Sequence, residues 1–240
     1  MRNRILTILA ITISAALQHS AATPIYSETF DNRDDKFPQG WFDSSHGTLT
    51  PKVVEIRNNA LYMSRPDQTN DSAATRNALY AGSGSSELTD YTVEAYFKNN
   101  HVANRSGVIV RWQDDSITNS NTLKGYLATI YNNEIYISKD SNPNGGFNHP
   151  DYLLATNKLN RPIFGDQKVR ITFTVSGSTL TARGYIKSRT GDFDRLIGEV
   201  TTTDKTYQQG SAGVMSRFLY RGRSTRWDDF SITEISGSKQ

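Results

Sequence analysis

Short runs in which apolar and polar residues alternate dominate the chain beyond its first 22 residues. In residues 91–98, Val93 and Phe97 belong to one set of positions, and Glu94 and Tyr96 belong to the other. Successive side chains of a β-strand point to opposite faces, so this two-residue period predicts strands with one buried and one exposed face. Helical periodicity is nearly absent from the same region. The alternation therefore predicts an all-β protein.

Turn signals separate these runs and set the expected topology. Val175-Ser176-Gly177-Ser178 predicts a tight hairpin turn, and Asn132-Asn133 predicts a second one because Asn tolerates positive φ. Many short strands with regular turns are typical of an antiparallel two-sheet sandwich, here a single domain over residues 23–240. The predicted strands are 25–30, 53–56, 60–64, 91–98, 106–113, 125–131, 134–138, 169–175, 178–187, 195–202, 212–218 and 226–235. The predicted long irregular stretches are 32–50, 65–74, 114–123 and 139–166.

The first 22 residues have the pattern of a secretory signal peptide. Arg2 and Arg4 form a short basic start, residues 5–17 form an apolar stretch, and Ser20-Ala21-Ala22 supplies small residues at a cleavage site. The apolar stretch is too short to span a bilayer comfortably, and no later stretch approaches that length. We therefore expect export to the periplasm or the medium after cleavage behind Ala22.

Charge and cysteine content exclude several classes of protein. The 240-residue chain carries 27 basic and 24 acidic residues, and loss of Arg2 and Arg4 with the leader reduces the net charge from +3 to +1. Nucleic-acid binding needs concentrated positive charge, so it is not expected. Because the chain has no Cys, disulfides and thiolate metal sites are excluded, and stability must come from a large packed core. We expect a monomer.

Several segments in order resemble a known superfamily. These are Glu28-Thr29-Phe30-Asp31, Pro38-Gln39-Gly40-Trp41, residues 106–114, residues 125–130, residues 134–139, the hairpin 168–187, residues 210–214 and Trp227-Asp228-Asp229-Phe230. Together they resemble the laminin-G-like branch of the concanavalin A-like lectin/glucanase superfamily, and they are similar to the 3-keto-disaccharide hydrolase domains. The resemblance implies a two-sheet antiparallel jelly-roll sandwich whose curved front sheet binds sugar. Leu127 and Thr129 stand where the related hydrolases tend to place Glu and Gln, which puts their chemistry in doubt.

The polar set of the alternating strands supplies a candidate carbohydrate surface. Aromatic faces cover the flat C–H patches of sugars, and charged or amide groups bind their hydroxyls. Ordinary cross-strand pairing is the competing interpretation of the same residues. The predicted ligand-binding residues are Arg111, Gln113, Tyr96, Tyr131, Tyr136 and Glu94, with Thr129 and Glu134 on the same expected face.

Three functions stay open at this point. The favoured one is a secreted, lectin-like protein that recognises a poly- or oligosaccharide on its concave sheet. A polysaccharide-degrading enzyme is the first alternative: a lyase could use Arg111 with tyrosines and His101 or His149, whereas a retaining glycosidase needs two carboxylates about 5 Å apart and no matching run exists. A structural or adhesion module without a small ligand is the second alternative.

The tryptophans and a group of acids complete the candidates. Trp112 shares the parity of Val108 and Val110 and is predicted in the core; Trp227 is predicted in the core or at its rim; Trp41 is the candidate stacking platform in a loop. No cofactor is expected except a structural calcium ion, because jelly rolls often hold one where the first and last strands meet. Its candidate oxygen ligands are Glu28, Asp31 and Asp228, with Asp229 beside them.

Overall fold

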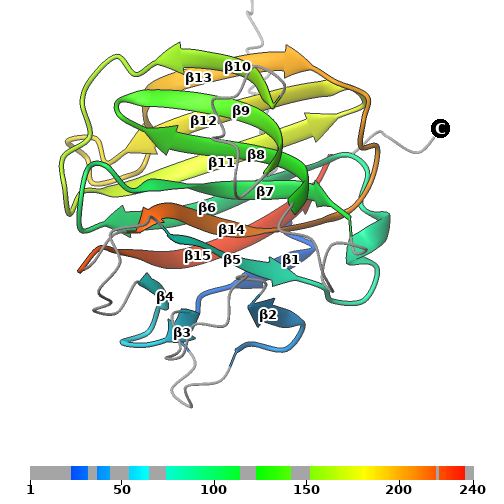
Figure 1. Cartoon of the computed structure of the whole chain (residues 1–240), viewed down its shortest axis with the longest axis horizontal. Coiled ribbons are helices and arrows are strands. Elements are labelled where there is room, and N and C mark those ends of the chain that lie inside the picture. The colour runs from blue at the N-terminus through cyan, green and yellow to red at the C-terminus, as the bar shows by residue number, and fades with distance from the viewer. Residues whose placement is uncertain are drawn as a thin grey trace, which may run out of the picture.

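Two stacked antiparallel sheets make up nearly all of the described structure (Figure 1). The computed structural model describes residues 23–31, 37–43, 54–64, 74–113, 123–141, 152–219 and 222–235. The helical element within these ranges is one short 3₁₀ turn, η1 (Ser85–Glu87). The described residues therefore contain no helix with the length and apolar character of a membrane span. The prediction of an all-β, two-sheet jelly-roll sandwich is confirmed. The predicted leader, residues 1–22, lies outside the described residues.

The first sheet, sheet A, has eight strands. Its order is β13–β12–β11–β6–β15–β4–β3, and β1 also pairs with β15. The strands are β13 (Arg195–Thr203), β12 (Thr179–Ile186), β11 (Lys168–Ser176), β6 (Tyr91–Asn99), β15 (Ser224–Glu234), β4 (Leu61–Ser64), β3 (Val54–Ile56) and β1 (Tyr26–Glu28).

The second sheet, sheet B, has seven strands in the order β10–β9–β8–β7–β14–β5–β2. The strands are β10 (Leu153–Lys158), β9 (Glu134–Ser141), β8 (Leu123–Tyr131), β7 (Arg105–Trp112), β14 (Ser211–Leu219), β5 (Ala74–Tyr80) and β2 (Trp41–Asp43). Neighbours in chain order can therefore belong to different sheets: β6 lies in sheet A, whereas β7 lies in sheet B.

Sheet A behaves as the alternation predicts. Strands β6, β11 and β12 alternate between buried and partly exposed residues along their whole length. Val93, Ala95 and Phe97 on β6 belong to the core between the sheets, together with the indole of Trp227 on β15. Burial of such side chains contributes roughly 1.5–3 kcal/mol each. The core placement predicted for Trp227 is confirmed.

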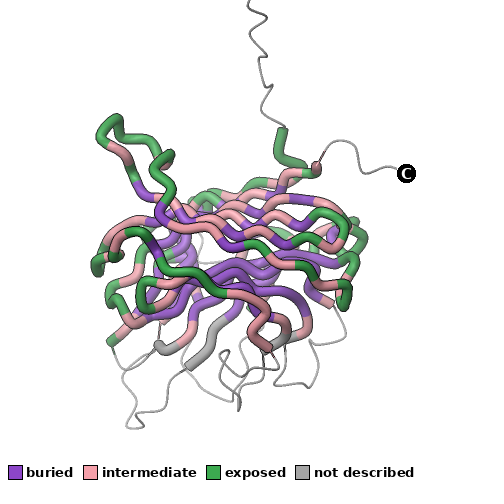
Figure 2. The backbone as a smooth tube through the Cα atoms, turned by 90° about the horizontal axis from the view of Figure 1, so that it is seen from above, coloured by how far each residue is buried: buried purple, intermediate pink, exposed green. Residues whose placement is uncertain are grey.

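Sheet B departs from the prediction because its outer face is also buried in places. All eight residues of β7 are buried, and Figure 2 shows one layer almost continuously buried while the other alternates. A second apolar cluster lies on this outer face. Its members are Leu79, Ile109, Trp112, Leu127 and Met215, with Phe42 packed against them. The expectation that one face of every strand is exposed is therefore wrong for sheet B.

A β-bulge at Arg111 explains why Trp112 lies on the outer face. Between two register pairs with β14, strand β7 has one extra residue, and Arg111 adopts the left-handed conformation with φ 48°. The bulge reverses the alternation, so Trp112 joins Ile109 instead of Val110. Glycine is needed opposite it: a Cβ on Gly210 would come within 2.5 Å of the Trp112 carbonyl oxygen. Trp112 is buried as predicted, but not between the sheets.

Most predicted strands coincide with observed ones, and three observed strands are missing from the prediction. Strand β10 lies inside the stretch predicted as irregular, β2 lies in another such stretch, and β5 had no assignment. Both predicted turns are confirmed, since Asn132, Asn133 and Gly177 have positive φ.

Candidate functional site

The structure divides the predicted ligand-binding residues among three places. Glu94 and Tyr96 lie on β6 in sheet A, whereas Tyr131 and Tyr136 lie on β8 and β9 in sheet B. Arg111 and Gln113 lie at the bulged end of β7. The expectation that all of them share one sheet face is therefore wrong, and each group has to be judged by its own contacts.

A polar group on the outer face of sheet B, the β8–β9 polar cluster, contains two of the six predicted ligand-binding residues, together with Thr129 and Glu134 from the same expected face. It consists of Arg105, Thr129, Tyr131, Glu134 and Tyr136. Tyr131 and Glu134 are cross-strand partners on either side of the Asn132–Asn133 turn, and Thr129 is the partner of Tyr136. The Tyr136 hydroxyl donates a hydrogen bond to Oε2 of Glu134.

Arg105 underlies this cluster and was not found from the sequence. Its Nε donates to Oγ1 of Thr129 over 2.8 Å, and its guanidinium lies 4.6 Å from the centre of the Tyr136 ring. Only 1% of Arg105 is exposed, and burial lowers its pKa to about 9, so it stays cationic at neutral pH. Arg105 is the first residue of its strand and is followed by Ser and Gly. The sequence pattern there does not distinguish a buried arginine from a solvated arginine at the end of a strand.

The exposure of the cluster decides which of its groups can meet a ligand. Arg105, Thr129 and Tyr136 are buried, whereas Tyr131 and Glu134 are partly exposed at the end of the β8–β9 hairpin. The buried members therefore form a rigid base, and the accessible groups are the Tyr131 ring and the Glu134 carboxylate. A carboxylate has about four acceptor positions, so Glu134 can accept further hydrogen bonds besides that from Tyr136.

Burial raises the pKa of Tyr136 to about 12. The hydrogen bond to Glu134 and the charge of that carboxylate act in the same direction, while Arg105 acts against them. Tyr136 is therefore protonated at neutral pH and serves as a hydrogen-bond donor, not as a base.

Glu94 and Tyr96 lie on the outer face of sheet A and are engaged there. Arg170 approaches Glu94 at 3.4 Å, and the Tyr96 hydroxyl donates to Glu94 over 3.2 Å. The Lys168 ammonium lies 5.0 Å from the centre of the Tyr96 ring. Thr92 and Thr174 pair across strands on the same sheet at 2.9 Å. This pairing of side chains across strands is what is expected of a structural surface.

Arg111 is a structural residue in this fold. Its Nε and Nη2 donate to the Thr89 carbonyl over 3.0 and 2.8 Å, and its Nη1 donates to the Tyr207 carbonyl over 2.9 Å. Nη2 also meets Asp90 at 3.2 Å, and the side chain is 2% exposed. The amide of Gln113 donates to the Arg111 and Gln209 carbonyls. Both residues hold the end of the sandwich together, and Arg111 is too buried to contact a polysaccharide.

A carboxylate network fixes the segment after β13 at the same end. Tyr126 donates to Oδ1 of Asp204 over 2.7 Å, and Lys139 lies 3.3 Å from Oδ2. Burial alone would raise the pKa of Asp204, but hydrogen bonds from Thr206 and Tyr126 and the charge of Lys139 outweigh it and lower the pKa to about 2.

This network makes stability depend on pH in a defined direction. Because the pKa of Asp204 in the folded protein lies below 3.8, the ordinary value for an aspartate, its contribution to stability is complete above that value and is lost as pH falls toward 2. Asp204→Asn should lower the free energy of unfolding by about 1–2 kcal/mol near neutral pH and by much less at the acid end. Urea unfolding of both proteins across this range measures the difference, and a constant difference at every pH would contradict it.

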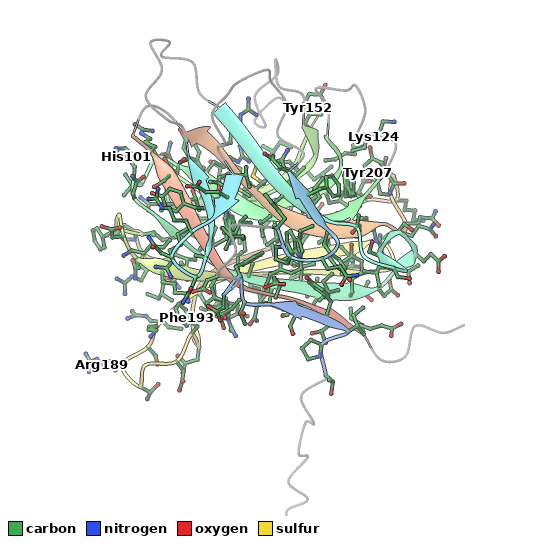
Figure 3. The ribbon with its side chains drawn as sticks, turned by 90° about the horizontal axis from the view of Figure 1, so that it is seen from below. His101, Lys124, Tyr152, Arg189, Phe193 and Tyr207 are labelled. Atoms are coloured by element: carbon green, nitrogen blue, oxygen red, sulfur yellow. The ribbon has the colours of Figure 1, made fainter. Side chains whose placement is uncertain are left out.

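The set proposed for a lyase is dispersed. Figure 3 places His101 at the opposite end of the sandwich from Tyr207, whose carbonyl accepts from Arg111. The tyrosine within hydrogen-bond reach of Arg111 is Tyr91, whose hydroxyl accepts from the Arg111 backbone N–H over 2.6 Å and is fully buried. His149 lies outside the described residues.

The predicted calcium ligands do not converge. Asp228 and Asp229 contact the Lys168 ammonium at 3.0 and 3.4 Å, and Glu28 accepts from the Phe30 backbone N–H over 2.7 Å. Asp31 is exposed. Within the ranges that the structure describes, no three His, Asp or Glu side chains are grouped so that they could hold a metal ion. The expectation of a calcium site built on these acids is therefore wrong.

Trp41 is also placed differently from the prediction. It begins strand β2 instead of lying in a loop, and only 6% of it is exposed. Its ring packs edge-on against Phe30 and Phe230, with centroids 5.2 and 4.9 Å away. Trp41 is a core residue and cannot serve as a stacking platform for a sugar.

Comparison with known proteins supports the fold and not a particular activity. No protein-family model matches the sequence, and no curated protein matches it. The chain is similar to the carbohydrate-binding module CBM66 from Bacillus subtilis, with 16% identity, a TM-score of 0.51 and coverage of 81% of this chain and 96% of that one.

Two further solved structures give the same result. Lectin II from Ulex europaeus is 10% identical, with a TM-score of 0.53 and coverage of 88% and 99%. A structure described with endo-acting O-glycanases of the human gut microbiota that initiate mucin breakdown is 7% identical, with a TM-score of 0.58 and coverage of 89% and 100%. The chain therefore shares a two-sheet jelly-roll fold with these proteins, which is the fold that the resemblance to the concanavalin A-like lectin/glucanase superfamily predicts.

Proposed function

We propose that this chain is an exported carbohydrate-binding protein that contacts a poly- or oligosaccharide through the β8–β9 polar cluster. The observation that carries the proposal is the partly exposed Tyr131–Glu134 pair above a buried base of Arg105, Thr129 and Tyr136. A ring face and an oriented carboxylate are what sugar C–H patches and hydroxyls require. Structural neighbours that include a carbohydrate-binding module and a lectin support the same class of ligand.

Binding is favoured over cleavage by the chemistry of the cluster. A retaining glycosidase needs two carboxylates about 5 Å apart, whereas the β8–β9 polar cluster contains a single carboxylate, that of Glu134, which accepts a hydrogen bond from the Tyr136 phenol. A lyase that uses tyrosine as its base needs that tyrosine deprotonated near neutral pH. The pKa of Tyr136 is raised to about 12, so its hydroxyl keeps its proton. The pattern of the first 22 residues supports export, and the proposed active form is a monomer.

Replacing Glu134 with Ala should weaken polysaccharide binding by about tenfold to a hundredfold, because charge-assisted hydrogen bonds to sugar hydroxyls are lost. The measurement is the dissociation constant, by calorimetry or affinity electrophoresis, for soluble polymers such as mannan, levan, β-glucan and mucin. Product release from each bound polymer is assayed in parallel to detect cleavage.

The fold supplies a matched control on its opposite side. Glu94 and Tyr96 repeat the Glu-x-Tyr arrangement of Glu134 and Tyr136, with the same hydroxyl-to-carboxylate hydrogen bond. Glu94→Ala should change the dissociation constant by less than about twofold, because Glu94 lies on the outer face of sheet A, on the other side of the sandwich from the β8–β9 polar cluster. Equal loss in both variants, or binding that neither variant changes, would refute the β8–β9 polar cluster as the contact surface.

A further inference from the structure

A polar cleft opens where the first strands of the two sheets meet, far from the β8–β9 polar cluster. It has a volume of about 510 Å³, within the range of ligand pockets. Its walls come from β1, from the turn before β2 and from the residues that follow β5. Strand β5 lies three strand spacings from β8, roughly 14 Å at the usual spacing. A ligand in the cleft would therefore not contact Glu134.

Two tyrosines join the sheets behind this cleft. Tyr26 of sheet A stacks on Tyr80 of sheet B, with ring centroids 3.8 Å apart and planes inclined by 25°. Gly40 and Gly82 make room for the Tyr80 ring: a Cβ on Gly82 would overlap its hydroxyl, and one on Gly40 would come within 3.2 Å of Cε2. Tyr80 is thus held between the other ring and two backbone segments, and it lines the cleft as a fixed aromatic wall.

Glu28 is oriented by its neighbours toward the same space. One carboxylate oxygen accepts from the Phe30 backbone N–H over 2.7 Å, and the other lies 3.5 Å from the Tyr26 hydroxyl. That hydroxyl is itself fixed by the Trp41 indole, which donates to it over 2.7 Å. Burial raises the pKa of Tyr26, so its hydroxyl stays protonated and cannot compete as an anion. The carboxylate keeps acceptor positions for a ligand.

The remaining wall is hydroxyl, amide and backbone in character, from Ser27, Gln39 and Ser83. Such a set pairs with adjacent hydroxyl groups, the carboxylate accepting two of them and the side-chain amide donating or accepting a third. An acidic sugar would bring its own negative charge beside Glu28, which disfavours it. The chemistry therefore selects a neutral polyhydroxyl ligand.

We propose that this cleft is a second, independent binding site for a single neutral sugar residue, held by the Glu28 carboxylate against the Tyr80 side chain. The site rests on its own residues and does not depend on polysaccharide binding at the β8–β9 polar cluster. Two separated sugar contacts on one chain would let the protein hold two parts of a branched glycan at once, which raises avidity without new contacts at either site.

Backbone amide shifts of the isotope-labelled mature protein test the proposal. The probes are the methyl glycosides of mannose, galactose and glucose, with glucuronate as the acidic probe and calcium chloride alone as a third arm. At least one neutral glycoside should shift the amides of Gly40, Gly82 and Ser83. Glu28→Gln should weaken this response by about tenfold, since a neutral amide oxygen still accepts from Phe30 but is a poorer acceptor for sugar hydroxyls.

Two variants separate this site from structural effects and from the other proposal. Glu55→Gln replaces a partly exposed glutamate on β3 that pairs with Arg57; it should leave the shifts unchanged, and so should Glu134→Ala. Tyr80→Phe keeps the ring stack and should weaken the response by a few fold. The proposal is overturned if no neutral glycoside moves these amides, if Glu28→Gln responds like the parent, if glucuronate binds as well as the neutral glycoside that binds best, or if calcium alone reproduces the shifts.

Discussion

Arg111→Met is expected to lower the free energy of unfolding by about 3–5 kcal/mol, because it removes the donors of a buried, fully engaged guanidinium. The substitution nearly conserves volume but removes the guanidinium donors to the Thr89 and Tyr207 carbonyls and the cation beside Asp90. A domain of this size should lose roughly 10 °C of melting temperature. Thermal and urea unfolding followed by circular dichroism measure both quantities.

Arg183→Met is the matched control for this result. Arg183 pairs with Glu199 on the outer face of sheet A, but the two side chains are 39% and 43% exposed. Surface ion pairs are worth about 0–1 kcal/mol, so this variant should unfold close to the parent. A melting temperature for Arg111→Met that equals the control, together with lost polysaccharide binding, would restore Arg111 as a ligand residue and contradict its structural assignment.

The bulge at Arg111 marks where prediction from alternation stops. A period of two is a local signal, and it correctly identifies strands such as β6, β11 and β12, whose registers are regular along the β6–β11 and β11–β12 pairs. One extra residue in β7 reverses every later side chain, and nothing in the residue types of Val110-Arg111-Trp112 announces it. The nearest signals are two glycines, Gly125 on β8 and Gly210 directly before β14, which become informative only once the pairing of these strands with β7 is known.

Sheet membership limited the prediction of the site in a similar way. Tyr131, Glu134 and Tyr136 stay together because a two-residue turn fixes the register of their hairpin. Glu94 belongs to a similar alternating pattern earlier in the chain. Between β6 and β7, however, the chain crosses from sheet A to sheet B, so the outward side chains of the two strands point to opposite sides of the sandwich. Arg105 sits directly after that crossing. Pairing between strands that are distant in the sequence determines which sheet each of these residues belongs to, and a single sequence does not reveal that pairing.

Trp227→Ala is expected to cost about 3–5 kcal/mol, as truncations of fully buried aromatic residues do. The indole is 0% exposed and packs against Phe97, with ring centroids 5.2 Å apart. Its Nε1 donates to Oγ of Ser216 over 3.1 Å, which ties β15 of sheet A to β14 of sheet B. Because β15 pairs with β6, β4 and β1, the cavity would open beneath the most connected strand of the sheet. Urea unfolding should show the loss as a lower midpoint with an unchanged slope.

Two further variants separate the packing of Trp227 from its hydrogen bond. Trp227→Phe keeps an aromatic ring but removes the indole N–H, so it should cost only about 1–2 kcal/mol and leave Ser216 to pair with the hydroxyl of Ser106, 3.4 Å away. Phe164→Ala removes an aromatic ring that is 61% exposed and should change stability by less than about 0.5 kcal/mol. If Trp227→Ala and Phe164→Ala unfold alike, the two sheets are not held together at this indole, and the packing assigned to β15 is wrong.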